Sequence, residues 1–250
     1  MLNIFRKKNK TIEQTGTFQL TTDMHSHILP GIDDGAPDIN ASLKLIRGMY
    51  DMGFRKLIAT PHIIGDLYRN DAATISEALE KVQSACANTG IEIAISAAAE
   101  YMLDDYFMDL LNKKIPLLRL HNNLVLTEFS YNTIPQNIDE ITFSMITEGY
   151  QPVLAHPERY AYFHKNFKDY ARLKEMGFHL QVNLLSLTGY YGNTVTKAAK
   201  YILDHNLADL VGTDLHHGRH LAVLQNIDNR QLFNKYLSQK KYNDFDALSL

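Results

Sequence analysis

The fold is decided first by the stretch Phe18-Gln-Leu-Thr-Thr-Asp-Met-His-Ser-His27, a short β-type run that ends in two histidines. The pattern recurs along the chain, because further short apolar runs end next to a side chain of a type that binds metal ions. These side chains are His62, Glu100, Glu128, His156, Asp214 and His216. In a barrel of parallel strands, the carboxyl ends of the strands open onto one face, which carries the chemistry. We therefore expect these side chains to converge on one site.

Two pairs in this set have a spacing that suits a metal site. His25 and His27 are separated by one residue, as are Asp214 and His216, and this spacing places both side chains on one face of a strand. Histidine and carboxylate ligands together suit Zn, Mn or Fe. A single His-x-His is equally compatible with ordinary surface or hydrogen-bonded residues, but the whole set in phase with the strands favours a metal centre.

The chain of 250 residues alternates strand and helix patterns with no linker or repeat. Seven such units predict a parallel α/β sheet, either closed or doubly wound. Because the expected ligands come from both the first and the last strand, a closed sheet is favoured over an open one, which would separate its edges. The expected strands are 18–24, 56–61, 91–97, 124–129, 151–155, 179–185 and 208–213. The expected helices are 37–52, 72–88, 104–112, 135–148, 166–176, 194–205, 219–226 and 228–241, with Pro135 at a first helical position.

Composition indicates one enzyme-sized domain, residues 17–250, preceded by a polar, basic tail of residues 1–16. A net charge of −3 gives no indication of the basic surface that nucleic-acid-binding proteins need. No apolar run approaches the length of a membrane span, and the N-terminus lacks the apolar core of a signal peptide, so we expect a cytoplasmic protein. The basic tail could touch an anionic membrane surface weakly, although a solubilising tail is the favoured interpretation.

The single cysteine, Cys86, does not fit a cysteine-dependent phosphatase. Such enzymes place an arginine six residues after the nucleophile, where this chain has Glu92. Cys86 instead continues an apolar stripe at helical spacing with Ile75, Leu79 and Val82, which predicts a small core residue. The chain also lacks a G-x-S-x-G elbow and a Walker loop. Any hydrolysis is therefore expected to use water activated by metal ions.

The opening segment Asp23-Met-His-Ser-His-Ile-Leu-Pro-Gly-Ile-Asp-Asp-Gly-Ala36 resembles the first motif of the PHP (polymerase and histidinol phosphatase) superfamily. Further matches are Ala59-Thr-Pro-His62, Ala99-Glu-Tyr101, Thr127-Glu-Phe129, Ala155-His-Pro-Glu-Arg159 and Gly212-Thr-Asp-Leu-His216. Together they resemble the branch of bacterial manganese-dependent protein-tyrosine phosphatases from capsule and exopolysaccharide operons. The resemblance covers about residues 18–220 and implies a distorted (β/α)7 barrel, a single domain that holds three metal ions.

The resemblance also implies a set of ligands. It assigns His25, His27, Glu100 and Asp214 to a first ion, Glu100, Glu128 and His156 to a second, and Asp34, His62 and His216 to a third. The implied cofactor is two or three Mn²⁺ ions, with Fe or Zn as alternatives. Asp33 adjoins Asp34, and the sequence leaves open which of them binds. Arg159 is expected to grip the phosphate through its planar fork. Arg219 is the candidate for a second arginine, although its spacing from Asp214 is shorter than the usual pattern.

These features predict a metal-dependent phosphomonoesterase that acts on phosphotyrosine. The resemblance implies a partner, the tyrosine-rich C-terminal tail of a membrane-associated tyrosine kinase that controls polysaccharide export. The leading alternative is a small-molecule phosphatase of the histidinol-phosphate type, followed by a non-catalytic metal-binding PHP domain and by a nuclease. Aromatic side chains in the expected loops favour a phenyl-bearing substrate. The candidates are Tyr68, Tyr101, Phe129, Tyr131 and Tyr160.

Overall fold

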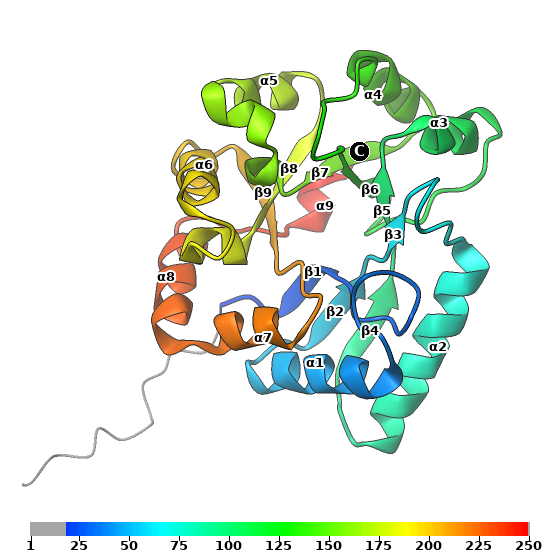
Figure 1. Ribbon diagram of the computed structural model, residues 1–250, viewed down its shortest axis with the longest axis vertical. Coiled ribbons are helices and arrows are strands. Elements are labelled where there is room, and N and C mark those ends of the chain that lie inside the picture. The colour runs from blue at the N-terminus through cyan, green and yellow to red at the C-terminus, as the bar shows by residue number, and fades with distance from the viewer. Residues whose placement is uncertain (1–18, 250) are drawn as a thin grey trace, which may run out of the picture.

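The computed structural model describes residues 19–249, which form parallel strands surrounded by helices (Figure 1). The predicted tail of residues 1–16 lies outside the described residues. The strands are β1 (Thr22–Ser26), β2 (Lys56–Ala59), β3 (His62–Ile63), β4 (Ala94–Ala97), β5 (Glu100–Met102), β6 (Leu124–Glu128), β7 (Gln151–Ala155), β8 (His179–Asn183) and β9 (Ala208–Gly212). The α-helices are α1 (Ile39–Asp51), α2 (Ala72–Asn88), α3 (Asp105–Asn112), α4 (Ile138–Thr147), α5 (Asp169–Glu175), α6 (Asn193–Asp204), α7 (Gly218–Gln225), α8 (Ile227–Leu237) and α9 (Phe245–Leu248). Three 3₁₀ segments join them, η1 (Pro157–Arg159), η2 (Ala161–Lys165) and η3 (Leu184–Thr188).

The strands form two parallel sheets rather than one continuous ladder. One sheet has the order β1-β2-β4 and the other β3-β5-β6-β7-β8-β9. The expected strands 56–61 and 91–97 correspond to β2 and β4, and two short strands that were not predicted, β3 and β5, follow them after Thr60-Pro61 and Ala98-Ala99. Pro61 lacks a backbone N–H, so it cannot donate to a sheet ladder. The predicted parallel α/β architecture is confirmed, whereas a fully paired barrel is not found within residues 19–249.

The two sheets meet where β1 passes the segment that follows β9. The backbone N–H of His27 donates to Leu215 O at 2.9 Å, and the N–H of Asp214 donates to His25 O at 2.8 Å. Gly212 permits this close approach, because a Cβ atom there would lie 2.8 Å from the Cβ of His25. The first and last strands of the chain are therefore neighbours, as a closed arrangement requires.

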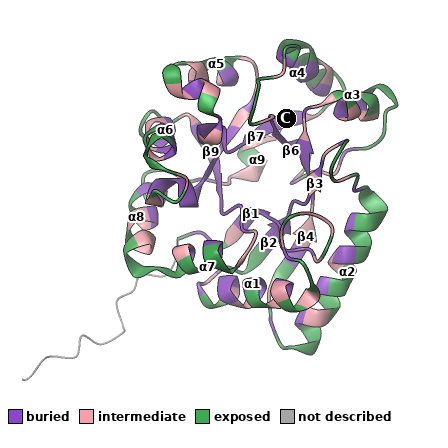
Figure 2. Cartoon of the chain, in the orientation of Figure 1, coloured by how far each residue is buried: buried purple, intermediate pink, exposed green. Residues whose placement is uncertain are grey.

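Apolar side chains fill the space enclosed by the strands. Met24, Ile58, Leu126, Val153 and Leu210 belong to one buried cluster, which residues of α9 cover at its edge. A larger cluster lies between the strands and the helices, and Figure 2 shows the buried strands at the centre, with the exposed faces of the helices outside. The sequence prediction missed α9, because four residues carry too little periodicity to be seen.

Local signals set several helix boundaries. Asp38, Asp71 and Asp104 each accept a hydrogen bond from a backbone N–H of the first turn, in α1, α2 and α3, which is the usual role of an N-cap. The prediction that a helix starts at Pro135 is wrong, since α4 begins at Ile138 after Asn137. Among the described residues, no helix is long and apolar enough to cross a membrane.

Candidate metal centre

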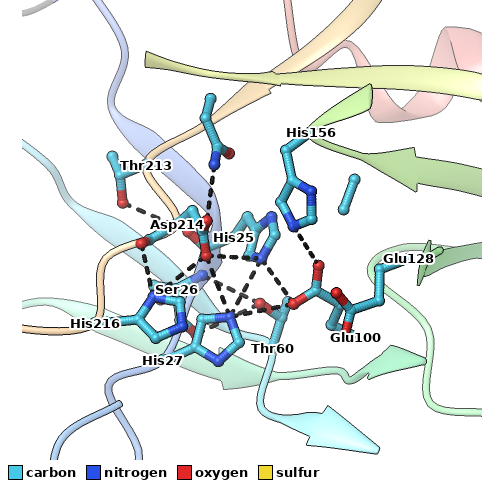
Figure 3. A network of polar contacts seen from close by, with 12 residues as sticks. His25, Ser26, His27, Thr60, Glu100, Glu128, His156, Thr213, Asp214 and His216 are labelled. Atoms are coloured by element: carbon cyan, nitrogen blue, oxygen red, sulfur yellow. Dashed lines mark hydrogen bonds and ion pairs between the residues drawn. The ribbon is translucent and has the colours of Figure 1, made fainter. Parts of the chain in front are cut away.

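The structure brings the nine predicted ligand residues together at one end of the strands, and Figure 3 labels all of them except Asp34 and His62. His25 lies at the end of β1, and His27 directly follows it. Glu128 ends β6, and His156 and Asp214 come just after β7 and β9. His62 and Glu100 instead begin the short strands β3 and β5.

A first group of four ligand atoms gathers around the Nε2 atoms of His25 and His27. His25 Nε2 lies 3.3 Å from His27 Nε2, 3.2 Å from Glu100 Oε2 and 3.4 Å from Asp214 Oδ1. His27 Nε2 lies 3.3 Å and 3.5 Å from the same two carboxylate oxygens. An ion that holds four ligands tetrahedrally at about 2.0–2.2 Å would separate them by about 3.3–3.6 Å. The two histidine nitrogens therefore lie at distances from each of the two carboxylate oxygens that a shared metal ion would allow.

Glu100 links this group to a second one. Its Oε1 lies 3.0 Å from His156 Nε2, and its Oε2 lies 3.3 Å from His62 Nδ1. Glu128 Oε1 lies 2.9 Å from His62 Nδ1. Because the two oxygens of Glu100 face different histidines, this carboxylate has the geometry of a bridge between two ions.

A third group forms around Asp34. Its Oδ1 lies 3.4 Å from His62 Nε2 and 3.5 Å from His216 Nε2, so His62 faces two groups with its two ring nitrogens. Asp33 is engaged elsewhere, since its Oδ2 lies 2.8 Å from His27 Nδ1 and its Oδ1 accepts from Gly35 N at 2.9 Å. The structure thus places the carboxylate of Asp34 in the cluster, while Asp33 orients His27.

The loop that carries these aspartates depends on Gly35. A Cβ atom at this position would lie 2.1 Å from the carbonyl oxygen of His27. The loop folds back over the end of β1, where Ala36 N donates to His27 O at 3.0 Å. Any other residue at this position would push the loop, and Asp34 with it, away from the histidines.

Two amide side chains that the sequence prediction missed orient the first group. Gln181 Oε1 lies 2.8 Å from His25 Nδ1, and Gln181 Nε2 donates to Asn183 Oδ1 at 2.9 Å. Asn183 Nδ2 in turn donates to Asp214 Oδ2 at 2.7 Å. An acceptor at Nδ1 places the proton of His25 there and leaves Nε2 free to bind a metal. The i, i+2 spacing of Gln181 and Asn183 on one strand was the available signal, but amides are not typical metal ligands.

Two of the ligand residues adopt strained backbone conformations. His156 has a φ of 37° and Asp214 a φ of 52°, both in the left-handed region that residues with a Cβ rarely occupy. Such conformations cost about 1–3 kcal/mol each and persist at sites where the surrounding structure imposes them. Both residues follow a strand end, where the turn directs their side chains into the cluster.

The electrostatics of the cluster fit divalent cations. Burial raises the pKa of Glu100, but His25 and the other histidines hold that pKa well below its usual range. Burial likewise opposes ionisation of Asp214, whereas His216, His25 and Arg159 lower its pKa. Although they lie close to the facing groups, the buried atoms Glu100 Oε1, Glu128 Oε1 and His62 Nδ1 make no well-aligned hydrogen bond within residues 19–249. Buried polar atoms without partners are costly, and metal ions bound here would satisfy all three.

A cavity of about 240 Å³ opens above the cluster. It is lined by Asp34, His62, Tyr131, His156, Arg159, Tyr191, Asp214, His216, His217 and His220. Arg159 Nη1 donates to Asp214 Oδ2 at 2.7 Å. Its guanidinium lies over the ring of Tyr131 at 5.0 Å and over that of Tyr191 at 4.4 Å. This cation therefore faces the cavity, held at the edge of the metal cluster by a carboxylate and two aromatic rings.

Arg219 is not brought into this cavity. It is exposed in the first turn of α7 and is absent from the residues that line the cavity. His217, the N-cap of α7, and His220, three residues later, occupy the inward face instead. The predicted role of Arg219 in phosphate binding is therefore not supported by its position.

Most of the aromatic residues proposed to meet a substrate belong to the core. Tyr101, Phe129 and Tyr160 are at most 2% exposed, and the hydroxyl of Tyr160 accepts from Phe129 N at 2.9 Å. That part of the prediction is wrong, because each of these rings packs beneath the loops rather than in them. Tyr131 does line the cavity, and Tyr68 stacks on the ring of His62 at 5.8 Å.

Cys86 lies buried on α2, in the core between the strands and the helices, and burial raises the pKa of its thiol. We expect Cys86→Ser to retain near-normal turnover of a phosphotyrosine peptide, since a buried, protonated thiol outside the cavity is no nucleophile. Steady-state kinetics on a variant with a native circular dichroism spectrum would check this. A hundredfold loss in that folded variant would contradict the metal-based interpretation.

The chain is similar in sequence to known proteins. The family model for capsular polysaccharide synthesis proteins CpsB/CapC matches residues 21–236. The tyrosine-protein phosphatase CpsB of Streptococcus pneumoniae is 30% identical over 200 residues, which span 78% of this chain and 82% of that protein. The tyrosine-protein phosphatase YwqE of Bacillus subtilis is 29% identical over 194 residues, 78% of this chain and 76% of that protein.

Solved structures are also similar to this chain. The structural study of YwqE from Bacillus subtilis and CpsB from Streptococcus pneumoniae, described as unique metal-dependent tyrosine phosphatases, provides a match with a TM-score of 0.77 and 27% identity over 90% of each chain. The histidinol phosphate phosphatase of Lactococcus lactis shares the fold, with a TM-score of 0.55 and 12% identity over 89% of this chain and 94% of that one. The chain therefore belongs to the CpsB/CapC family of capsular polysaccharide synthesis proteins.

Proposed function

We propose that this chain is a metal-dependent phosphomonoesterase that removes phosphate from tyrosine residues of proteins. The observation that carries the proposal is the position of Arg159, which lines the same cavity as five of the nine clustered ligand residues, namely Asp34, His62, His156, Asp214 and His216. An anion-binding fork beside a cation cluster is what a phosphate monoester requires. The relatives named as tyrosine-protein phosphatases support the same reaction.

The residues divide the work in a definite way. Divalent ions bound by the cluster would activate a water molecule and neutralise phosphoryl oxygens. Arg159 would bind a further phosphoryl oxygen, while Asp214 holds its Nη1 in place. Gln181 and Asp33 fix the ring orientations of His25 and His27. We also propose that the nine ligand residues bind two or three Mn²⁺ ions and that Arg159 binds the phosphate of the substrate.

The cavity walls favour an aryl phosphate over a phosphorylated amino alcohol. Tyr131 and Tyr191 line the cavity, and their faces suit a phenyl ring. Among the described residues that line it, Asp34 and Asp214 are the only carboxylates, and both belong to the ligand groups. A cationic amine such as that of histidinol phosphate would thus find no free carboxylate.

We further propose that the partner is a membrane-associated tyrosine kinase of polysaccharide export and that the protein is cytoplasmic.

The purified protein should hydrolyse a phosphotyrosine peptide at least tenfold more efficiently than histidinol phosphate or a phosphoserine peptide of the same sequence. The reason is the aromatic lining together with the absence of a free carboxylate among the described cavity residues. Measured kcat/KM values for the three substrates on one preparation would decide. A preference for histidinol phosphate would overturn the substrate and leave the fold and the metal cluster in place.

Metal content gives a separate test. Nine ligand side chains are too many for one ion, so the active protein should carry two or three transition-metal ions per chain. Chelation should abolish activity, and Mn²⁺ should be among the ions that restore it, because histidine and carboxylate ligands accept it. Elemental analysis that finds at most one ion per fully active chain would reject the multinuclear arrangement.

A further inference from the structure

A second, larger hollow lies beside the cavity, between α4 and α5. Its volume is about 420 Å³, and Figure 1 shows the two helices next to each other. One wall comes from the segment that enters α4 and the other from η2 and α5. The apolar side chains that line it are Ile134, Pro135, Ile138, Phe163, Leu173 and Met176. We call this hollow the α4–α5 groove.

A row of tyrosine rings connects the groove to the cavity. Tyr131 lines the cavity and packs on Tyr160, with ring centroids 5.5 Å apart. Tyr160 stacks on Tyr162 at 5.5 Å with the rings nearly parallel, and Tyr162 lines the groove. The hydroxyl of Tyr162 donates to Ser130 O at 3.1 Å, which ties η2 to the segment that carries Tyr131. Tyr160 itself is buried, so the exposed connection between the two hollows is the segment from Tyr131, which lines the cavity, to Ile134, which lines the groove.

Exposed apolar side chains gather around the same groove. Ile134 is 39% exposed, Phe143 72% and Ile146 39%. Asp139 lines the groove, and Phe143 and Ile146 follow it on the same face of α4 at helical spacing. Ile146 reaches toward α5, because its Cδ1 lies 3.0 Å from where a Cβ of Gly177 would stand. An exposed apolar patch beside a reaction cavity is typical of a binding surface.

From these observations we infer that the α4–α5 groove binds an apolar side chain of the phosphotyrosine-bearing peptide, an inference that rests on the proposed function. The tyrosine rings set an upper limit on the distance between the cavity and the groove. The ring centroids of Tyr131 and Tyr162 are two steps of 5.5 Å apart, so they lie at most about 11 Å from each other. An extended peptide advances about 3.3 Å per residue. The apolar side chain is therefore expected within about three residues of the phosphotyrosine.

A peptide series tests this distance. Each peptide carries one phosphotyrosine among serines, with a single leucine at one of the four positions on either side. We expect leucine at one position within about three residues, on one side only, to raise kcat/KM about fivefold to tenfold through a lower KM. Ile134→Asp should abolish this gain, and turnover of p-nitrophenyl phosphate, which is too small to reach the groove, should not change. Ile227→Asp is the matched control, because Ile227 is 55% exposed at the start of α8, outside the groove.

Binding of non-hydrolysable phosphonate analogues of the same peptides separates the groove from the catalytic proposal. If histidinol phosphate is preferred but the leucine-dependent affinity persists and Ile134→Asp removes it, the assignment of phosphotyrosine as the substrate fails and the groove stands. If every leucine position gives the same kcat/KM, or Ile134→Asp behaves like the unaltered chain, the groove assignment is overturned. It is also overturned if Ile134→Asp changes the sedimentation coefficient without changing peptide affinity, because the groove would then join two copies of this chain.

Discussion

Replacing Glu100 by alanine is expected to lower kcat/KM on a phosphotyrosine peptide by about a thousandfold or more. The carboxylate is fully buried and stands within 3.3 Å of ring nitrogens from His25, His27, His62 and His156. Its two oxygens face two ligand groups, so its loss should weaken the binding of two metal ions at once. Elemental analysis and kinetics on the same sample would measure both effects.

His216→Ala is the informative comparison for Glu100→Ala. The ring of His216 faces the Asp34 group, at 3.5 Å from Asp34 Oδ1, so this variant should mainly reduce the binding of one ion. Glu77→Ala serves as a surface control, because Glu77 is exposed and pairs only with Lys81 among the described residues. Equal metal loss in Glu100→Ala and His216→Ala would argue against Glu100 as a bridge. Unchanged metal content in Glu100→Ala would reject its role as a ligand.

Arg159→Lys should reduce catalytic efficiency by about 10–100-fold, equivalent to roughly 1.4–2.7 kcal/mol of transition-state stabilisation. Lysine keeps the charge but loses the planar fork. The guanidinium uses Nη1 for Asp214 and lies over the rings of Tyr131 and Tyr191, an arrangement that points its remaining donors in one plane. The tetrahedral ammonium group of lysine cannot reproduce this planar arrangement of donors. Inhibition by inorganic phosphate should weaken in parallel with kcat/KM.

Arg219→Lys is the matched control for this substitution. Arg219 is exposed on α7 and does not line the cavity, so its replacement should leave kinetics unchanged. A loss equal to that of Arg159→Lys would show that Arg219 reaches the substrate and that the sequence-based assignment was sound. Normal efficiency in Arg159→Lys would assign Arg159 to a structural role beside Asp214.

The sequence predicted most of the fold because the relevant signals are local. The bounds of α2 agree with the prediction of 72–88, since Asp71 forms a capping box with Thr74 and the helix stops close to Gly90. The seven strand regions were found from their apolar runs. The short strands β3 and β5 were not found, because they follow points where pairing changes between sheets at residues with little local signature, such as Ala98 and Ala99. Pro135 was misplaced for a related reason, since a proline fits a turn as well as a first helical position.

The sequence by itself determined most of the side chains that gather at the site, because every ligand except the loop residue Asp34 stands next to an expected strand end and parallel strands direct those ends to one place. Only the tertiary structure decided how they are used. Asp34 rather than Asp33 faces the cluster because the loop folds back against His27 at Gly35. Gln181 and Tyr191 join the site from β8 and from the loop before α6. Such contacts depend on the distances between elements far apart in the chain, and no local pattern of residues encodes those distances.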